Sequence, residues 1–178
     1  ERLLYKLFGV NAELLIDHAW GWESCSMRDI KAYRPRSRSL SSGQVLSEPY
    51  DFEKARLIVQ EMADSLVLDL VRKGLLTNLI DLTVGYDIQN LRDADRRSRY
   101  KGEIKTDYYG REVPKHAHGS ERLGCYSSST QRITDATLRL FDRIVDPALL
   151  VRRIYAVANH TMPEGALDPS QKSEQLSL

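Results

Sequence analysis

Histidines and cysteines are the first residues in this chain whose types and spacing could do chemistry. His116 and His118 alternate on a predicted strand, so both imidazoles lie on one side, where a metal ion could be held together with Cys125 and His160. No further ligand follows at a spacing typical of zinc sites, and histidines on strands are more often hydrogen-bonded surface residues. Cys125 has no neighbour in sequence that would activate it as a nucleophile. We therefore predict no metal site and no catalytic residue.

Basic and hydroxyl side chains form a second set, which suits phosphate binding. They occur on or near predicted strands that a single sheet would bring together. Arginines neutralise phosphate oxygens, and short hydroxyl side chains let backbone N–H groups approach them. Aromatic side chains are scarce there, with Tyr155 the one clear candidate, which favours a duplex backbone over unstacked single-stranded bases. The predicted binding residues are Arg36, Arg38, Ser39, Ser41, Lys115, His118, Ser120, Arg122, Arg152 and Arg153.

Composition limits the class of protein. The chain has 178 residues with 42% hydrophobic content, enough for one medium domain with appendages. Its 26 basic and 25 acidic residues nearly cancel, so total charge neither supports nor excludes nucleic acid. Two cysteines fit a reducing compartment better than a disulfide scaffold, and no apolar run is as long as a membrane span or signal peptide. We expect a soluble, cytoplasmic and monomeric protein with no membrane contact.

A long helix at 50–73 organises the elements that must position these side chains. Asp51 stands at its N-cap position, and Gly74 follows two basic residues at its C-terminal end. Apolar residues recur at steps of three and four, which predicts one buried face. That face comprises Phe52, Ala55, Val59, Met62, Ala63, Leu66, Val67 and Leu70.

Four strands and a second helix complete the predicted domain. The helix begins at a cap in 127–130, ends at Asp146-Pro147, and places Ile133, Ala136, Leu140, Phe141 and Ile144 on one face. The order strand-helix-strand-strand-helix-strand predicts an α+β fold, in which two helices cover one face of a four-stranded, mostly antiparallel sheet. The other face is left open to solvent and to a ligand. The strands are expected at 37–46, 79–88, 115–123 and 150–159.

The remaining segments flank or interrupt this domain. A short helical segment precedes it, and the chain opens without an initiator methionine or a helix cap, so we expect a piece of a longer protein. The predicted divisions are 1–23 with two short helices, 24–36 as a basic linker, 37–162 as the domain, 89–114 as a basic excursion ending in a hairpin around Tyr108-Tyr109-Gly110, and 163–178 as a disordered tail.

Four short stretches resemble the C-terminal region of bacterial Y-family translesion DNA polymerases. They are PYDFEKA at 49–55, LTVGYD at 82–87, PKHAHG at 114–119 and VRRI at 151–154. The stretches FGVN at 8–11 and AWG at 19–21 are similar to the end of the helical thumb in that family.

The resemblance implies that 37–162 is the little finger domain, whose sheet lies in the major groove and holds the backbone of primer–template DNA during lesion bypass. Residues 1–23 would end the thumb, and 24–36 would be the tether. The implied setting is translesion synthesis, DNA repair and the SOS response. The parent enzyme would be a nucleotidyltransferase that uses Mg. The chain lacks the family's metal-binding carboxylates, so it should need no cofactor and be inactive alone.

The last residues resemble a second family motif. Gln175-Leu176-Ser177-Leu178 is similar to the start of the peptide by which bacterial polymerases dock on the sliding clamp. The resemblance implies that Gln175, Leu176 and Leu178 bind the clamp, although the usual following phenylalanine is missing.

Two other classes of protein stay open on the residues alone. A non-catalytic α+β module could bind RNA or a protein, but a ferredoxin-like RNA binder should carry paired aromatics on its central strands, and none is seen. A small metal-dependent hydrolase using His116, His118 and Cys125 would need bound metal in stoichiometric amount.

Overall fold

Two compact units make up the chain, residues 1–37 and 38–178. The computed structural model describes residues 1–33 and 38–166. Arg36 and the predicted clamp-binding residues Gln175, Leu176 and Leu178 therefore lie outside the described residues.

The first unit consists of short helices. The two helices predicted on either side of Gly9 are present, and a third lies inside the segment predicted as a basic linker. It begins at a capping box: Ser26 Oγ accepts the N–H of Asp29, and the Asp29 carboxylate accepts the N–H of Ser26. The elements are α1 (Arg2–Phe8), a 3-10 turn (Gly9–Asn11), α2 (Ala12–Ala19) and α3 (Met27–Ala32).

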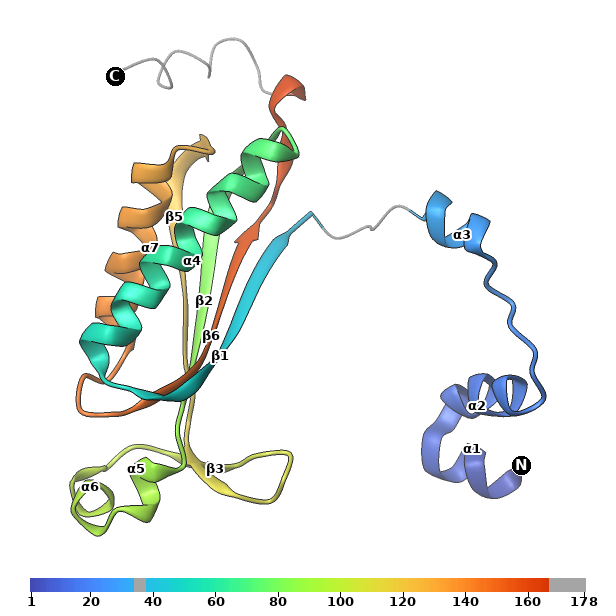
Figure 1. Cartoon of the computed structure of the whole chain (residues 1–178), viewed down its shortest axis with the longest axis horizontal. Helices are drawn as coiled ribbons and strands as arrows, with labels where there is room; N and C mark the ends of the chain where they lie inside the picture. The colour runs from blue at the N-terminus through green and yellow to red at the C-terminus, as the bar shows by residue number, and fades with distance from the viewer. Residues whose placement is uncertain (34–37, 167–178) are drawn as a thin grey trace. The chain divides into compact units, whose positions relative to one another are not determined.

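The second unit is an antiparallel sheet with two long helices on one face, which confirms the predicted α+β fold (Figure 1). Its four long strands lie in the order β1-β6-β2-β5, and the two-residue strand β7 pairs with the start of β2. The main elements are β1 (Leu40–Tyr50), α4 (Phe52–Arg72), β2 (Leu75–Tyr86), β5 (Ala117–Ser127), α7 (Thr130–Ile144), β6 (Val151–Asn159) and β7 (Met162–Pro163), followed by a 3-10 turn (Glu164–Ala166).

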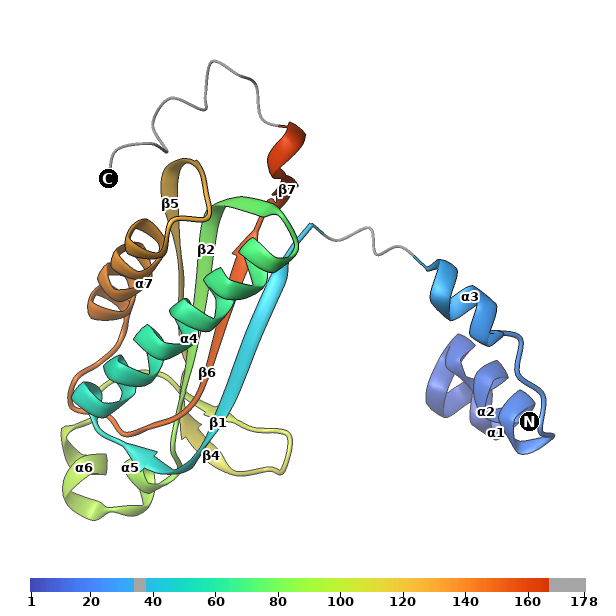
Figure 2. The same ribbon diagram turned by 45° about the horizontal axis from the view of Figure 1, so that its top comes forward.

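The core lies between the sheet and the helices α4 and α7, which cross the same face side by side (Figure 2). Asp51 Oδ1 accepts the N–H of Lys54 at 2.9 Å and caps α4, as predicted. Gly74 ends the helix with φ of 59°, a conformation that favours glycine. Alternate residues of β2 and β6 point into the core, which the strands' period of two requires. They are Ile80, Leu82, Val84, Ile154, Ala156 and Ala158.

A buried amide helps to anchor the excursion between β2 and β5 to the end of the sheet. Asn90 is fully buried, and its Nδ2 donates to the carbonyl oxygens of Asp87 and Leu150, both at 2.9 Å. Its Oδ1 accepts the N–H of Leu150 at 2.8 Å. Two short helices that the sequence did not predict precede the predicted hairpin. The elements are α5 (Gln89–Arg92), α6 (Ala94–Arg99), β3 (Ile104–Thr106) and β4 (Glu112–Pro114).

The predicted boundary between domain and tail also shifts. Pro163 belongs to β7 and pairs with Leu75, and the 3-10 turn follows, so the expectation of disorder from 163 onward is wrong for 163–166. None of the helices in the described ranges combines the length and hydrophobicity that a membrane crossing requires.

Candidate nucleic-acid interface

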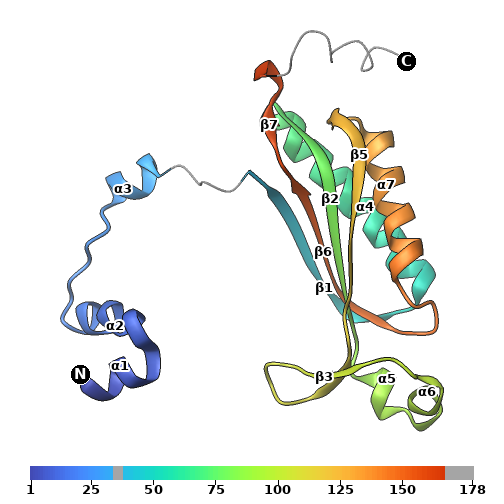
Figure 3. The same ribbon diagram turned by 180° about the vertical axis from the view of Figure 1, so that it is seen from behind.

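The sheet face turned away from α4 and α7 is not covered by these helices (Figure 3), and we name it the open face. The strand register places mostly small and polar side chains on it. Paired residues of antiparallel strands point to the same side, so the register builds rows across the sheet. One row runs Gly43, Tyr155, Thr83 and His118. The open face comprises Ser41, Gly43, Val45, Leu79, Asp81, Thr83, Gly85, His118, Ser120, Arg122, Arg153, Tyr155, Val157 and Asn159.

Two glycines keep the largest side chains of the open face flat. A Cβ at Gly43 would come within 2.6 Å of the Tyr155 ring, so the ring lies across that glycine. A Cβ at Gly85 would come within 2.6 Å of Cγ and Nε of Arg153, so the arginine lies across β2. The open face therefore has low relief, and its one aromatic ring does not project as a stacking platform.

A carboxylate sits at the centre of the open face. Asp81 Oδ2 accepts a hydrogen bond from Asn159 Nδ2. Within the described residues, the buried Oδ1 of Asp81 has no hydrogen-bond partner. Nearby, Thr83 Oγ1 and His118 Nδ1 are 2.9 Å apart. The formal charges of the face are thus those of Arg122 and Arg153 at its two ends and of Asp81 between them.

Five of the predicted binding residues come together on the open face: Ser41, His118, Ser120, Arg122 and Arg153. Arg38 and Ser39 lie just before β1, where the carbonyl oxygen of Arg38 accepts the N–H of Thr161 at 2.8 Å.

Two predicted residues lie elsewhere. Lys115 precedes β5, and its Nζ bonds Glu103 at 2.7 Å, an interaction that raises the pKa of the lysine. Arg152 stands at a register shift between β2 and β6, with its Nε 3.7 Å from Asp87 Oδ2. Lys115 does not join Arg153 on the open face as expected, because it pairs with Glu103 of the hairpin. Arg152 falls at the register shift, outside the rows of the open face, and lines the pocket described next together with Arg153.

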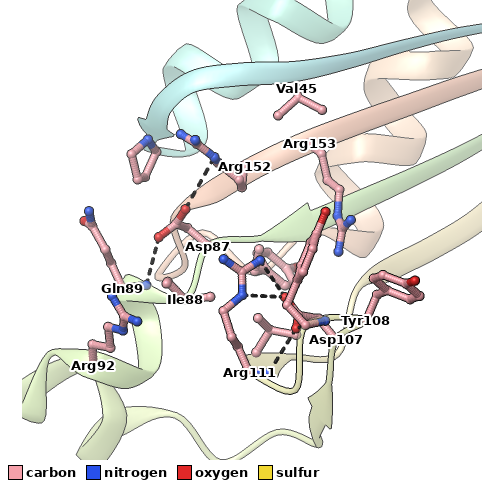
Figure 4. Close-up of a pocket in the computed structure, with 14 residues that line it drawn as sticks. Val45, Asp87, Ile88, Gln89, Arg92, Asp107, Tyr108, Arg111, Arg152 and Arg153 are labelled. Carbon is pink, nitrogen blue, oxygen red and sulfur yellow. Dashed lines mark hydrogen bonds and ion pairs between the residues drawn. The ribbon is translucent and has the colours of Figure 1, made fainter.

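The open face continues into a pocket of about 560 Å³ between the end of the sheet and the excursion (Figure 4). Val45 and Arg153 line both the open face and the pocket. Figure 4 shows Arg153 pointing toward the hairpin side of the pocket. The charged residues that line it are Asp87, Arg92, Asp107, Arg111, Arg152 and Arg153.

The hairpin tip above this pocket is held by Asp107. Its Oδ1 accepts the N–H groups of Tyr109 and Arg111, both at 2.9 Å, and its Oδ2 accepts Nε of Arg111 at 2.8 Å. The bond from Arg111 is the main reason that the pKa of Asp107 is lowered. Gly110 has φ of 75°, which suits a tight turn. The sequence predicted this hairpin turn, but it did not predict which side chains the turn exposes to solvent.

The tip presents two tyrosines to solvent. Tyr108 is 96% exposed and Tyr109 is 75% exposed. Their rings meet edge to face with centroids 5.4 Å apart, and the Arg111 guanidinium lies 4.9 Å from the centroid of Tyr109. Aromatic side chains of the described part thus reach solvent on the hairpin and not only on the sheet.

The histidines and cysteine considered as metal ligands are placed apart from one another. Within residues 1–33 and 38–166, no group of three or more His, Cys, Asp or Glu side chains could hold a metal ion. His118 bonds Thr83, and Nδ1 of His160 lies 3.2 Å from Oδ1 of Asn78. The geometry offers no support for a hydrolase built on these residues.

Comparison with known proteins identifies the family. Residues 37–178 match the impB/mucB/samB family C-terminal domain. The chain belongs to this family and is the C-terminal domain of a Y-family DNA polymerase, which confirms the resemblance noted from the sequence.

No curated protein matches the chain. Among solved structures, it is similar to a chain in the "Complex of beta-clamp processivity factor and little finger domain of PolIV", with 12% sequence identity and a TM-score of 0.43. The match covers 79% of this chain and 97% of that one.

Proposed function

We propose that the open face holds the sugar–phosphate backbone of primer–template DNA while the parent polymerase copies past a lesion, in DNA repair and the SOS response. The observation that carries the proposal is the position of Arg122 and Arg153 at opposite ends of a flat face of small side chains. Neither arginine forms an ion pair with the residues that the structure describes.

The spacing of these two arginines suits a duplex. Arg122 pairs with Leu79 and Arg153 with Gly85, six residues further along β2. At a rise of about 3.4 Å per residue the two positions lie roughly 20 Å apart. Two flexible side chains at that separation can reach phosphates on both sides of a major groove about 12 Å wide. Contacts of this kind position DNA without reading its sequence.

In this proposal the domain positions the duplex and catalyses no reaction itself. The magnesium-dependent transfer of nucleotides belongs to the catalytic region of the polymerase, and the open face keeps the duplex in place for it. Ser41 and Ser120 support the proposal because short hydroxyl side chains leave the strands close to the phosphates.

Removing both arginines of the open face should weaken duplex binding and make it less sensitive to salt. For the double variant Arg122→Ala/Arg153→Ala, the slope of log K against log salt should fall by roughly two, because each phosphate contact contributes about 0.9. Fluorescence anisotropy with a labelled duplex at several salt concentrations measures this. The matched control is Arg132→Ala/Arg139→Ala, which removes two charges from α7 on the other side of the sheet. Equal slopes for the two double variants would contradict the proposal.

We also propose that Gln175, Leu176 and Leu178 dock on the sliding clamp. The support is the motif in the sequence: the glutamine amide can form hydrogen bonds at the mouth of a pocket, and the two leucines can fill apolar subsites. The glutamine and the two leucines by themselves should bind weakly, because an aromatic side chain is a main anchor in contacts of this kind.

Extending the chain beyond Leu178 through the protein's natural next residues should make clamp binding measurable. The extended chain should bind the clamp in isothermal titration calorimetry, and Gln175→Ala/Leu178→Ala in that chain should abolish the heat of binding. The control Leu167→Ala/Gln171→Ala changes a leucine and a glutamine outside the motif and should bind as before. Duplex affinity should be the same in all of them. Absence of binding by the extended chain at high micromolar concentration would rule out the clamp.

A further inference from the structure

We propose that the β3–β4 hairpin and the pocket beneath it bind an unpaired nucleotide of single-stranded DNA. The base would stack on Tyr108 or Tyr109, and its phosphate would lie among the arginines of the pocket. The inference rests on the proposed function in one respect, that the duplex from which this nucleotide emerges lies on the open face.

The exposed rings are the first observation. A tyrosine that is 96% exposed contributes almost nothing to the core, and the neighbouring ring is 75% exposed. The tip that carries them is fixed by the hydrogen bonds of Asp107 and by Gly110, so the rings are held out on an ordered turn. Rings presented in this way suit the faces of unpaired bases, which any sequence offers.

The charge of the pocket is the second observation. Four arginines line it against two aspartates, Asp87 and Asp107. Both carboxylates are already engaged: Asp107 by Arg111 and two backbone N–H groups, and Asp87 by Arg152 and the N–H of Gln89. Arg92 and Arg153 pair with no acid in the described part of the chain. Arg92 thus remains for an anion in this pocket, beside Arg153, which the pocket shares with the open face, and guanidinium groups fit a phosphate diester in charge and geometry.

Continuity with the open face is the third observation. Arg153 and Val45 belong to both surfaces, so a strand that leaves a duplex on the sheet meets the pocket next. The volume of about 560 Å³ is within the usual range for small-ligand pockets, about 300–1,000 Å³. The positions of the aromatic side chains agree with this path of the strand. The open face is flat and its ring does not project, whereas the hairpin exposes two rings.

Tyrosines and arginines are also frequent in protein interfaces. The excess positive charge of the pocket and its continuity with the proposed duplex site favour DNA over a protein partner. If the hairpin instead bound a protein, duplex affinity would not depend on a single-stranded tail.

The experiment compares DNA with and without unpaired nucleotides, using the whole 178-residue chain. Fluorescence anisotropy gives affinities for a blunt duplex, for the same duplex with a 5′ or a 3′ tail of four thymidines, and for that duplex with an abasic tail. One of the thymidine tails should raise affinity about tenfold, and the abasic tail should not, because the gain comes from stacking. A 2-aminopurine in the favoured tail should lose fluorescence on binding.

Variants at the tip separate stacking from other effects. Tyr108→Ala/Tyr109→Ala should abolish the gain from the tail and leave blunt-duplex affinity and melting temperature unchanged, since both side chains are exposed. Tyr108→Phe/Tyr109→Phe keeps the rings and should keep the gain. A wild-type chain with no gain from either tail, or an alanine variant that retains it, would overturn the inference. Such an outcome leaves the duplex proposal standing if the open-face arginines still control binding to blunt DNA.

Discussion

Replacing Leu66 by aspartate should unfold the second unit. Leu66 is 2% exposed, in the middle of α4 and within the core cluster. An unpaired carboxylate there costs several kcal/mol, which approaches the whole stability of a typical domain, about 5–15 kcal/mol. Circular dichroism at 222 nm against temperature should show a transition that is lost or lowered by tens of degrees.

The same substitution two residues further on is the control. Leu68 is 61% exposed on the outer side of α4, so Leu68→Asp should melt within a few degrees of the wild type. Asp64 of the same helix would be a less suitable control position, because it is exposed but its Oδ1 accepts a hydrogen bond from Thr134 Oγ1 of α7 at 3.3 Å. Equal melting temperatures for Leu66→Asp and Leu68→Asp would show that the buried face is assigned incorrectly.

Replacing Asn90 by alanine should be the most costly polar substitution in the excursion. It removes three hydrogen bonds and leaves the N–H of Leu150 without its partner. Losing these bonds from a buried site should cost about 2–3 kcal/mol and lower the melting temperature by roughly 5–10 °C. Differential scanning calorimetry measures the change in melting temperature.

Hydrogen exchange tests which part of the domain loses stability in this variant. In Asn90→Ala, amide protons of α5 and of the hairpin should exchange faster than those of α4, because the amide joins the excursion to the sheet. The control is Gln89→Ala, since Gln89 is exposed and bonds Asp87 through its backbone N–H, which alanine retains. An unchanged melting temperature in Asn90→Ala would show that the excursion is attached by other contacts.

Helices and strands whose apolar residues recur at a regular spacing could be predicted from the sequence. The face of α4 and the alternation of β2 follow from which residues are apolar, and burial in the structure reproduces both. The helix caps at Asp51 and Gly74 were also predictable, because capping depends on local residue types.

Features that depend on register or on distant partners could not be predicted. The sequence does not show that Lys115 pairs with Glu103, or that a register shift displaces Arg152, because both depend on how strands align. The anchoring role of Asn90 depends on Leu150, sixty residues away. The capping box of α3 is different: Ser26 and Asp29 stand at the spacing of a capping box, a local signal that does not depend on apolar periodicity.

If the open face holds duplex DNA as proposed, the flatness that Gly43 and Gly85 give it would affect motion along DNA. Side chains that lie against the sheet would not reach between the base edges, so neighbouring binding positions would differ little in energy. The carboxylate of Asp81 at the centre of the face would weaken the attraction to phosphate further. The barrier at each base-pair step would then be shallow, and we expect the domain to diffuse along the duplex while staying attached to it.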